Sequence, residues 1–459
     1  MFEKIKSIHF VGVGGIGMSG LALVLKNMGY QISGSDISKT SLTKYLESQG
    51  IKIYYTHAPQ NIQNASVVVY SSAIKPDNPE IKYALSRKIP VIPRAEMLAE
   101  LMRMKYSIAV SGTHGKTTTT SMIGTILEYA GYNPTVIVGG KFLGMKSGAK
   151  IGTGKYLVAE ADESDRSFLL LYPTISVVTN IEKDHLDFYK NLSEIKKAFL
   201  LFVNKVPFYG ASIICNDCKN VRSIIPHIKR EFITYGIKYQ ADIQATNITY
   251  CDLRTNFTIN YKGQSYEINL NVPGEHNVLN ALAAIAVGLK LDIPFKTIKD
   301  ALNNFTGIHR RLEKKGEKNN IIIFDDYAHH PTEIMATLKT LRLNYPNHKI
   351  IVIFQPHRYT RTLKLGLSFG SAFIYADLII VTKIYPAQEN PIPNVSSHII
   401  VNAIKKFNQK HNKKIPVVYK KSFTEIIDFV KEIVKPNNII ITIGAGNIWQ
   451  VGEELLKVL

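Results

Sequence analysis

The stretch "SGTHGKTTTT", residues 111–120, carries Gly-Lys-Thr in the order that a phosphate-binding loop uses. Gly112 and Gly115 are separated by two residues, whereas the general loop places four residues before its Gly-Lys pair. The stretch still follows a strand-like run, "YSIAV", and opens a helical pattern, so backbone amides and Lys116 can surround phosphates. The sequence predicts a variant ATP site. A helix start with threonine caps is the alternative interpretation.

A divalent cation would complete such a site. The Thr117 hydroxyl can reach a Mg²⁺ ion, and acidic residues end the later segment "YLVAEADES". Oxygen donors of this kind are the ligands that Mg²⁺ takes. We expect Mg²⁺, with Mn²⁺ as the alternative.

A glycine turn lies near the start of the chain. Gly12, Gly14 and Gly17 fit G-x-G-x-x-G between a strand-like run and a helical pattern, and Asp36 ends the next strand-like run. Glycines there let backbone N–H groups approach a diphosphate at the positive end of a helix. Alone, this pattern indicates an NAD site or glycines needed only for packing.

The pattern of elements predicts an α/β protein. Short β-branched runs alternate with helical patterns, which is typical of parallel sheets with crossover helices. We expect three domains, at 1–105, 106–309 and 310–459, with an antiparallel excursion from about Ala241 to Leu270. In such sheets ligands bind beyond the carboxyl ends of strands. Polar residues follow four strand-like runs there: Asp162, Glu163, Asp184, His185, Asp325, Asp326, His329, His330, His357, Arg358 and Arg361.

The amino-acid composition limits the classes of function that are compatible with this chain. The chain has 459 residues, 45% of them hydrophobic, and no apolar run near the ~18 residues of a membrane helix, so we expect a cytoplasmic protein that does not enter membranes. The net charge of +20 comes from lysines spread along the chain, without a nucleic-acid-binding motif. A positive field that attracts anionic substrates is the better use of this charge. Cys215 and Cys218 have C-x-x-C spacing, but no second ligand pair accompanies them, so we expect no metal there.

The two glycine loops together reduce the number of functions that fit the sequence. A dehydrogenase has no use for a second triphosphate site, and a switch-type nucleotide hydrolase has no use for the first turn. A third block rich in Arg and His follows them. The combination predicts that ATP energy is spent on a substrate that itself carries a nucleotide.

Motifs along residues 9–361 resemble those of the Mur ligases of peptidoglycan synthesis. They are "FVGVGGIGMSGLA", "SGTHGKTTTT", "EADESDRSFL", "NIEKDHLDFY", "VPGEHNVLNALAA", "DDYAHHPTEI" and "QPHRYTRT". The resemblance implies a Rossmann-like UDP-sugar-binding domain, a P-loop-type central ATPase domain and a Rossmann-like C-terminal domain for the amino acid. It also implies ATP-dependent joining of L-alanine to the lactyl carboxylate of UDP-N-acetylmuramate, through an acyl phosphate. Attachment of a recycled peptide and NAD-dependent oxidation are the alternatives.

The resemblance also implies roles for individual residues. The UDP-sugar would contact Gly14, Gly15, Ile16, Gly17, Asp36, Ser71 and Ser72. ATP would contact Gly112, Thr113, His114, Gly115, Lys116, Thr117, Thr118, His276, Asn277, Asn280, Arg310, Arg311 and Asp326. Metal ligands would be Thr117, Glu160 and His185. The amino-acid end would involve Tyr327, His330, His357, Arg358 and Arg361, and the catalytic residues would be Lys116, His185, His357 and Arg358.

The sequence departs from the family pattern at one position. Relatives that add later residues carry a carbamate-modified lysine where this chain has Phe199, so we expect no carbamate. His357 could accept the ammonium proton or only shape the pocket, and a helix cap and a packed core histidine are the alternative roles for His329 and His330. Substrates on separate domains would require closure. We expect a monomer or homodimer with no nucleic-acid partner.

Overall fold

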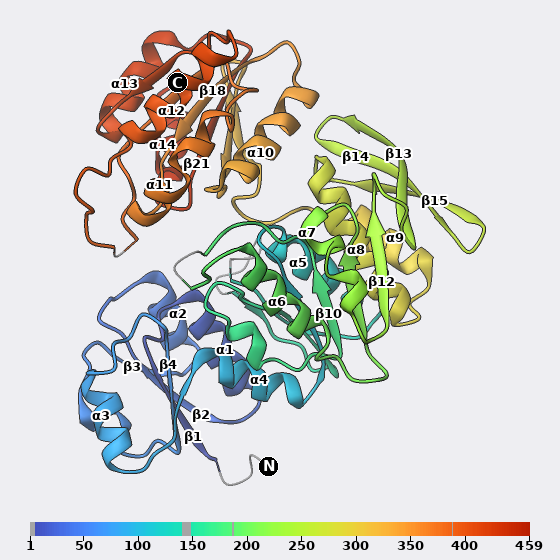
Figure 1. Cartoon of the computed structure of the whole chain (residues 1–459). Helices are drawn as coiled ribbons and strands as arrows, with labels where there is room; N and C mark the ends of the chain where they lie inside the picture. Colours follow the sequence, from blue (N-terminus) through green and yellow to red (C-terminus); the bar gives the residue numbers. More distant parts are fainter. Residues whose placement is uncertain (1–4, 140–147, 186–187, 388) are drawn as a thin grey trace. The chain divides into compact units, whose positions relative to one another are not determined.

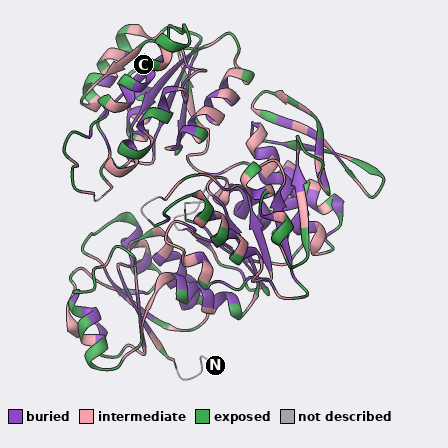
Figure 2. Ribbon diagram, in the orientation of Figure 1, coloured by how far each residue is buried: buried purple, intermediate pink, exposed green. Residues whose placement is uncertain are grey.

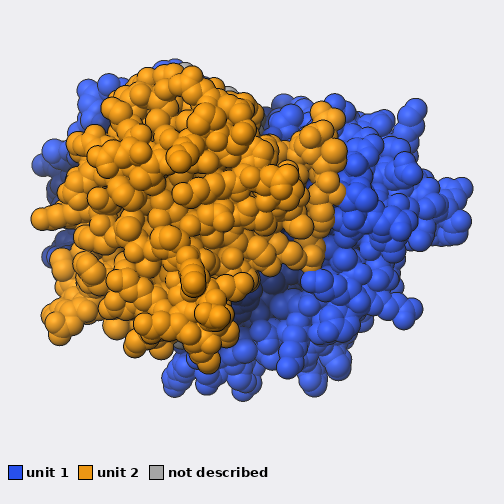
Figure 3. Space-filling view, turned by 90° about the horizontal axis from the view of Figure 1, so that it is seen from above, with its two compact units in different colours: residues 1–249, 255–272, 276–306 blue, residues 250–254, 273–275, 307–459 orange. Residues whose placement is uncertain are grey.

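The computed structural model describes residues 5–139, 148–185, 188–387 and 389–459. It contains three sheets with helices beside them, which confirms the predicted α/β class (Figure 1). The chain forms two compact units (Figure 3). The first comprises Met1–Thr249, Thr255–Val272 and His276–Thr306; the second comprises Tyr250–Arg254, Pro273–Glu275 and Gly307–Leu459.

The first sheet has five strands, all parallel, in the order β3-β2-β1-β4-β5. Ile8, Phe10 and Val11 of its central strand are fully buried, as expected for a strand covered on both faces. Its strands are β1 (Ser7–Val11), β2 (Gln31–Ser35), β3 (Lys52–Tyr54), β4 (Val67–Tyr70) and β5 (Val91–Pro93). Its helices are α1 (Ile16–Asn27), α2 (Ser41–Ser48), η1 (Pro59–Ile62), α3 (Pro79–Ser86) and α4 (Arg94–Arg103).

The second sheet has ten strands in the order β15-β14-β13-β12-β11-β10-β6-β9-β7-β8. Its strands are β6 (Tyr106–Ser111), β7 (Thr135–Ile137), β8 (Ala149–Lys150), β9 (Tyr156–Glu160), β10 (Ile175–Val178), β11 (Ala211–Cys215), β12 (Phe232–Gly236), β13 (Ile243–Cys251), β14 (Arg254–Tyr261) and β15 (Gln264–Leu270). Its helices are α5 (Lys116–Tyr129), η2 (Ser167–Leu170), α6 (Leu192–Val203), α7 (Lys219–Arg222), η3 (Ile225–His227), α8 (Glu275–Lys290) and α9 (Phe295–Asn303).

The predicted antiparallel excursion is confirmed. β14 and β15 pair antiparallel, with Thr255 opposite Leu270, whereas β12 pairs in parallel with the start of β13. Thr255, Phe257 and Ile259 are buried while the residues between them are not, which is the period of two that one covered face requires. This alternation made the segment recognisable in the sequence.

The first two sheets share one hydrophobic core within the first unit. α1 contacts β7 and β8, and α4 contacts β6 and η2. Figure 2 shows the buried residues concentrated on the strands and on the helix faces that cover them. The rings of Phe199 and Phe202 on α6 pack on Phe168, with centroids 5.2 and 5.0 Å away. The glycine turn after β1 and the Gly-Lys-Thr loop after β6 therefore belong to one packed body.

The third sheet forms the second unit, in the order β16-β17-β21-β18-β19-β20, with β16 antiparallel to β17 and the other pairs parallel. Its strands are β16 (Glu313–Lys318), β17 (Ile321–Asp326), β18 (Lys349–Phe354), β19 (Leu378–Val381), β20 (Val417–Tyr419) and β21 (Asn438–Ile443). Its helices are α10 (Pro331–Asn344), α11 (Tyr359–Leu365), η4 (Gly366–Gly370), α12 (His398–Lys410), α13 (Phe423–Ile433) and α14 (Trp449–Val458).

Within the described ranges, no helix is both long and apolar enough to cross a lipid bilayer.

Replacing Phe202 with alanine should destabilise the first unit. Its side chain is fully buried, so the variant should lose about 3–5 kcal/mol of unfolding free energy to lost burial and a cavity. Leu201, next to it on α6, is 59% exposed, and Leu201→Ala should change stability by less than about 0.5 kcal/mol. Calorimetry and urea unfolding of the full chain measure both; equal shifts would contradict this account of the core.

Candidate active site

The glycine turn connects β1 to α1 at the carboxyl edge of the first sheet. Gly12 has φ +80°, in the left-handed region that favours glycine, and the Ser35 carbonyl accepts from the N–H groups of Gly12 (2.8 Å) and Val13 (3.0 Å). Gly15 caps α1 by its backbone alone and is exposed. The first amides of α1, beginning at Ile16, have no intrahelical partners and can receive an anion.

Asp36 and Ser71 lie against this turn. The Asp36 carboxylate accepts from the Gly14 N–H at 2.9 Å, so it fixes the loop as well as being placed for a ribose. The Ser71 N–H donates to Val11, and a Cβ on Gly12 would be 3.2 Å from Ser71 Cβ. Ser72 is exposed. The structure therefore gathers the predicted UDP-sugar residues at one edge of the sheet, while their contacts with a ligand stay a prediction.

Glu80 is a buried support for this edge that sequence reasoning missed. Its carboxylate accepts from Ser35 Oγ (2.6 Å) and Asn61 Nδ2 (2.7 Å), contacts His57 Nδ1 at 2.9 Å, and lies 3.5 Å from His9 Nε2. Because Ser35 also holds the turn through its carbonyl, Glu80 links α3 to the glycine loop. The sequence signal was the helix start "NPE", where Asn78 caps α3, but it does not reveal burial.

The Gly-Lys-Thr loop connects β6 to α5 and requires glycine at both positions. Gly112 has φ +138° and Gly115 +83°; a Cβ on Gly112 would be 2.1 Å from Thr179 Oγ1, and one on Gly115 would be 2.5 Å from Asn280 Oδ1. No side chain fits at either distance. The glycines at this shortened spacing are therefore required by the close packing of the loop.

The end of β10 holds this loop in place. Asn180 accepts from the His114 N–H (2.9 Å) through its side chain and from the Thr113 N–H (3.2 Å) through its carbonyl. The Thr179 hydroxyl donates to the His114 carbonyl at 2.6 Å. Sequence reasoning missed these two residues, although "VVTN" marks them as polar groups directly after a buried strand.

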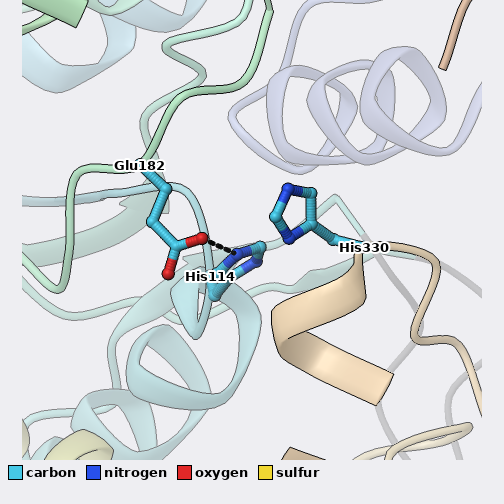
Figure 4. A group of neighbouring side chains, drawn as sticks. All are labelled: His114, Glu182 and His330. Carbon is cyan, nitrogen blue, oxygen red and sulfur yellow. Dashed lines mark hydrogen bonds and ion pairs between the residues drawn. The ribbon is translucent and has the colours of Figure 1, made fainter. Parts of the chain in front are cut away.

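His114 extends the link to the following segment. Its Nε2 lies 3.4 Å from Glu182 Oε2, and the Glu182 N–H donates to the Thr113 hydroxyl at 2.9 Å (Figure 4). His330, the third residue drawn in Figure 4, belongs to the second unit. Thr113 and His114 thus fix the loop through their side chains and also through their backbone N–H groups, which Asn180 engages.

Lys116 is held between neutral and anionic oxygens. Its Nζ donates to the Gly112 carbonyl (2.6 Å) and to Glu163 Oε1 (2.8 Å). Burial lowers the pKa of Lys116, but Glu163, Asp162 and Glu160 outweigh it, and the pKa is raised overall. Lys116 is therefore a permanent cation, as a phosphate-binding lysine must be.

The predicted metal ligands lie around the same carboxylates. Glu160 ends β9, and Thr117 is the second residue of α5. His185 Nε2 lies 3.7 Å from Glu163 Oε1 and 3.6 Å from Asp184 Oδ2. The pKa of His185 is lowered by burial but raised more by Glu163 and Asp184, and is raised overall. A hydroxyl, carboxylates and an imidazole suit Mg²⁺ or Mn²⁺, and the ligand assignment stays a prediction.

The predicted adenine-side residues lie at the start of α8. Asn277 and Asn280 are buried, and Asn280 accepts from the Thr119 hydroxyl at 3.1 Å and donates to Asn277 at 3.2 Å. Thr118, also predicted to contact ATP, is buried in α5, and His276 is half-buried. Asn280 therefore supports the loop from behind, and His276 is the residue of this motif with more exposed surface.

In the second unit, Arg310 and Asp326 have structural bonds. Arg310 donates to Asp325 Oδ2 (2.8 Å) and to the carbonyls of Gly446 and Gly444 (3.1 and 2.5 Å). Burial raises the pKa of Asp326 to about 6, and its carboxylate accepts from the N–H groups of Leu312 and Ala328. Both side chains fix the loop that carries the predicted ATP contacts.

The neighbouring residues that were predicted to bind ligands differ in their contacts with the rest of the protein. Arg311 makes a looser ion pair with Glu333, at 3.8 Å. Tyr327 is 37% exposed, with the guanidinium carbons of Arg310 and Arg311 5.1 and 5.7 Å from its ring centre. His330 caps α10, accepting from the Thr332 N–H at 3.4 Å. Arg311 and Tyr327 are therefore the better candidates for ligand contact, and His330 has the alternative capping role.

His357, Arg358 and Arg361 form a cluster after β18. Arg361 Nη1 donates to His357 Nδ1 at 3.0 Å, which requires a neutral imidazole because a guanidinium only donates. Burial and the nearby arginines lower the pKa of His357 to about 4. Arg358 has φ +69°, a conformation that costs of order 1 kcal/mol and marks functional segments. His357 is thus a poor acceptor for an ammonium proton, which favours its pocket-shaping role.

Two other sequence positions lie away from this chemistry. Phe199 is fully buried in the core of the first unit. Cys215 is buried in β11, and burial raises the pKa of its thiol to about 12, so it stays protonated and is a poor metal ligand.

Glu80→Gln should lower the unfolding free energy of the first unit at neutral pH. It should also make that free energy less dependent on pH in the acid range. Burial raises the pKa of Glu80, but the bonds from His9, Ser35 and Asn61 lower it further, from 4.5 to about 2. The stabilisation, about 3 kcal/mol, is present above pH ~4.5 and is lost as pH falls toward ~2. Urea unfolding at a series of pH values measures both effects. Glu47→Gln, an exposed change on α2, is the control, and matching curves for the two variants would refute the assignment.

Comparisons with known proteins cover the whole chain. Residues 7–106 match the Mur ligase family, catalytic domain; residues 110–288 match the Mur ligase middle domain; residues 310–446 match the Mur ligase, glutamate ligase domain. The UDP-N-acetylmuramate–L-alanine ligase of Trichlorobacter lovleyi is 52% identical over 459 residues, covering 100% of both chains. That of Geobacter sulfurreducens is 50% identical, covering 99% of this chain and 98% of the relative.

Solved structures agree with this relationship. The UDP-N-acetylmuramate–alanine ligase of Thermotoga maritima has a TM-score of 0.81 at 31% identity, covering 99% of both chains. A murein peptide ligase from Psychrobacter arcticus has a TM-score of 0.71 at 26% identity, covering 98% of both chains. Motifs, fold and relatives thus agree across all three sheets, and the chain belongs to the Mur ligase family.

Proposed function

We propose that this chain is the ADP-forming ligase that joins L-alanine to the lactyl carboxylate of UDP-N-acetylmuramate, an early cytoplasmic step of peptidoglycan precursor synthesis. One observation carries the proposal: Gly17 of the glycine turn and Lys116 of the ATP loop line the same small pocket in the first unit. An anionic nucleotide-linked acid and a triphosphate can therefore meet there. The relatives that are about 50% identical over the full chain are named for this reaction.

The reaction requires activation of the acid. A carboxylate resists amide formation because its oxygen is a poor leaving group. A carboxylate oxygen attacks the γ-phosphorus of ATP, the bond to the β-phosphate oxygen breaks, and ADP leaves. The amine of L-alanine then attacks the acyl carbon, loses a proton, and the tetrahedral intermediate collapses to the amide and inorganic phosphate.

Positive charge is what makes this encounter feasible, since triphosphate, carboxylate and diphosphate repel one another. Lys116 would pass from Glu163 to the β- and γ-phosphates, a short movement for a flexible side chain. The amides at the starts of α1 and α5 supply fixed partial charges. These charges would be in position before the phosphates bind. Such electrostatic preorganisation is the main source of catalysis in phosphoryl transfer.

Mg²⁺ is the cation that we expect with ATP, with Mn²⁺ as the alternative. When bound, it would neutralise phosphate charge and orient the γ-phosphoryl group. Thr117 and Glu160 would hold one ion, and His185 would help to hold a second. The carboxylates of Glu163 and Asp184 lie 3.7 and 3.6 Å from Nε2 of the His185 imidazole.

The second unit would bind the amino acid and close the ATP site. Arg358 and Arg361 would grip the planar carboxylate of L-alanine, and Tyr327 would line the same pocket. Nε of Arg361 is buried without a hydrogen-bond partner in the described part of the chain, so that guanidinium has unused donor capacity. Arg311 would reach ATP. Because these residues and Lys116 belong to different units, turnover requires the units to bring their substrates together.

The alternatives are less well supported. A nicotinamide-dependent reaction would not require the triphosphate site around Lys116. Among the solved structures, a murein peptide ligase is 26% identical to this chain and an alanine ligase is 31% identical. The relatives that are about 50% identical over the full chain are named L-alanine ligases.

Phosphate release should require three substrates together. With ATP, UDP-N-acetylmuramate and Mg²⁺ present, adding L-alanine should start steady release of phosphate, measured in a coupled assay. Glycine, L-serine and a tripeptide should give slower release, and NAD⁺ should change nothing. Release that does not depend on any amino acid would refute the proposal.

Lys116→Ala should separate binding from chemistry. The variant should bind UDP-N-acetylmuramate within about twofold of wild type, but its rate should fall by about a hundredfold or more because a cation at the transferring phosphoryl group is lost. Calorimetric titration and the phosphate assay measure the two effects. Lys197→Ala, an exposed change on α6, is the matched control. Near-normal turnover in Lys116→Ala would remove the ATP-site assignment.

A further inference from the structure

The pocket shared by the two nucleotide-binding turns contains a cation to which nothing above assigns a role. The pocket has a volume of about 100 Å³, and its polar lining includes Arg94, Lys116, Glu160 and Asp162. Lys116 and Glu160 have proposed uses in ATP and metal binding. Arg94 is the other cation among the described residues that line this pocket.

Arg94 lies beside the glycine turn. It is the first residue of α4 and follows β5 at the edge of the first sheet that also carries the glycine turn and Asp36. Its side chain packs on the backbone of α1: a Cβ on Gly17 would be 3.3 Å from Arg94 Nη1 and 3.4 Å from Cδ. The glycine therefore leaves room for the guanidinium at the start of the helix.

The guanidinium is half-buried and keeps its donors for a ligand. In the part of the chain that the structure describes, no hydrogen bond or ion pair engages it. Its charge acts through space on Asp162, where it adds to Lys116 in lowering the pKa of that carboxyl. A half-buried arginine without a protein partner, facing a pocket, fits an oxyanion that arrives with a substrate.

The position of Arg94 indicates which oxyanion this is. The amides of α1 can receive the diphosphate, and Lys116 with the ATP loop can receive the γ-phosphate. Arg94 lines the same pocket as Gly17 and Lys116, and it packs beside Gly17. The reacting carboxylate of the acid must occupy the space between diphosphate and γ-phosphate.

We propose that Arg94 binds the lactyl carboxylate of the UDP-linked acid and selects substrates that carry it. The proposal rests on the function proposed above. A bidentate guanidinium–carboxylate pair would fix the plane of the carboxylate and present one oxygen to the γ-phosphorus. Arg94 is then a specificity-determining residue for this substrate.

Equilibrium binding with two ligands tests the proposal. UDP-N-acetylglucosamine carries the same diphosphate and lacks the lactyl carboxylate. Calorimetric titration of the full chain without ATP should show that Arg94→Met weakens UDP-N-acetylmuramate binding by about tenfold or more and leaves UDP-N-acetylglucosamine binding within about twofold. Arg94→Lys should lie between, since it keeps the charge and loses the planar fork. In turnover, KM for the UDP-linked acid should rise and KM for ATP should not.

The controls separate the ways in which this could fail. Arg87→Met removes an exposed positive charge from the C-terminal end of α3 and should leave both affinities unchanged, which tests for a general field effect. Equal weakening of both ligands in Arg94→Met would assign Arg94 to the diphosphate and overturn the proposal, as would unchanged binding of both. Arg94→Lys keeps the test decisive if the methionine variant does not fold. If the wild-type chain binds neither ligand, the proposed function itself fails.

Discussion

Mutual repulsion of anions is the constraint on which the rest of the structure depends. The fold meets it by placing the starts of two helices and two cationic side chains at one pocket of the first unit. Parallel strands make this arrangement possible, because every connecting loop that follows a strand lies at the same edge. The glycines at 12, 112 and 115 have positive φ, and a Cβ at 112 or 115 would collide with Thr179 or Asn280.

Buried carboxylates form a second level of support under these loops. Glu80 holds Ser35 below the glycine turn, and Glu163 holds Lys116 and lies near His185. Asp326 holds the backbone before β16, at Leu312, and after β17, at Ala328. None of the three needs to touch a substrate for its role. Burying a charge costs desolvation free energy unless the charge is fully paired. The presence of these carboxylates beneath the loops therefore indicates that fixed loop geometry is important.

The sequence was sufficient to predict the sheets, the antiparallel excursion and the edge at which the polar residues gather, because strand periodicity and glycine spacing are local signals. It did not predict which polar residues point inward. Thr179 and Asn180 clamp the ATP loop from another strand, and Asn280 supports it from α8. Arg94 lies in the run "IPRAEML", residues 92–98, where no sequence signal indicated a functional residue. Such partners are distant in sequence and are brought together only by the fold.

The bonds between the ATP loop and the end of β10 have a mechanical consequence. Thr179 and Asn180 grip the backbone of Thr113 and His114, and the same segment continues through Glu182 to His185. A short connecting segment therefore joins the clamp on the Gly-Lys-Thr loop to the imidazole that is predicted to hold a metal ion. A shift of this segment would move both ends together.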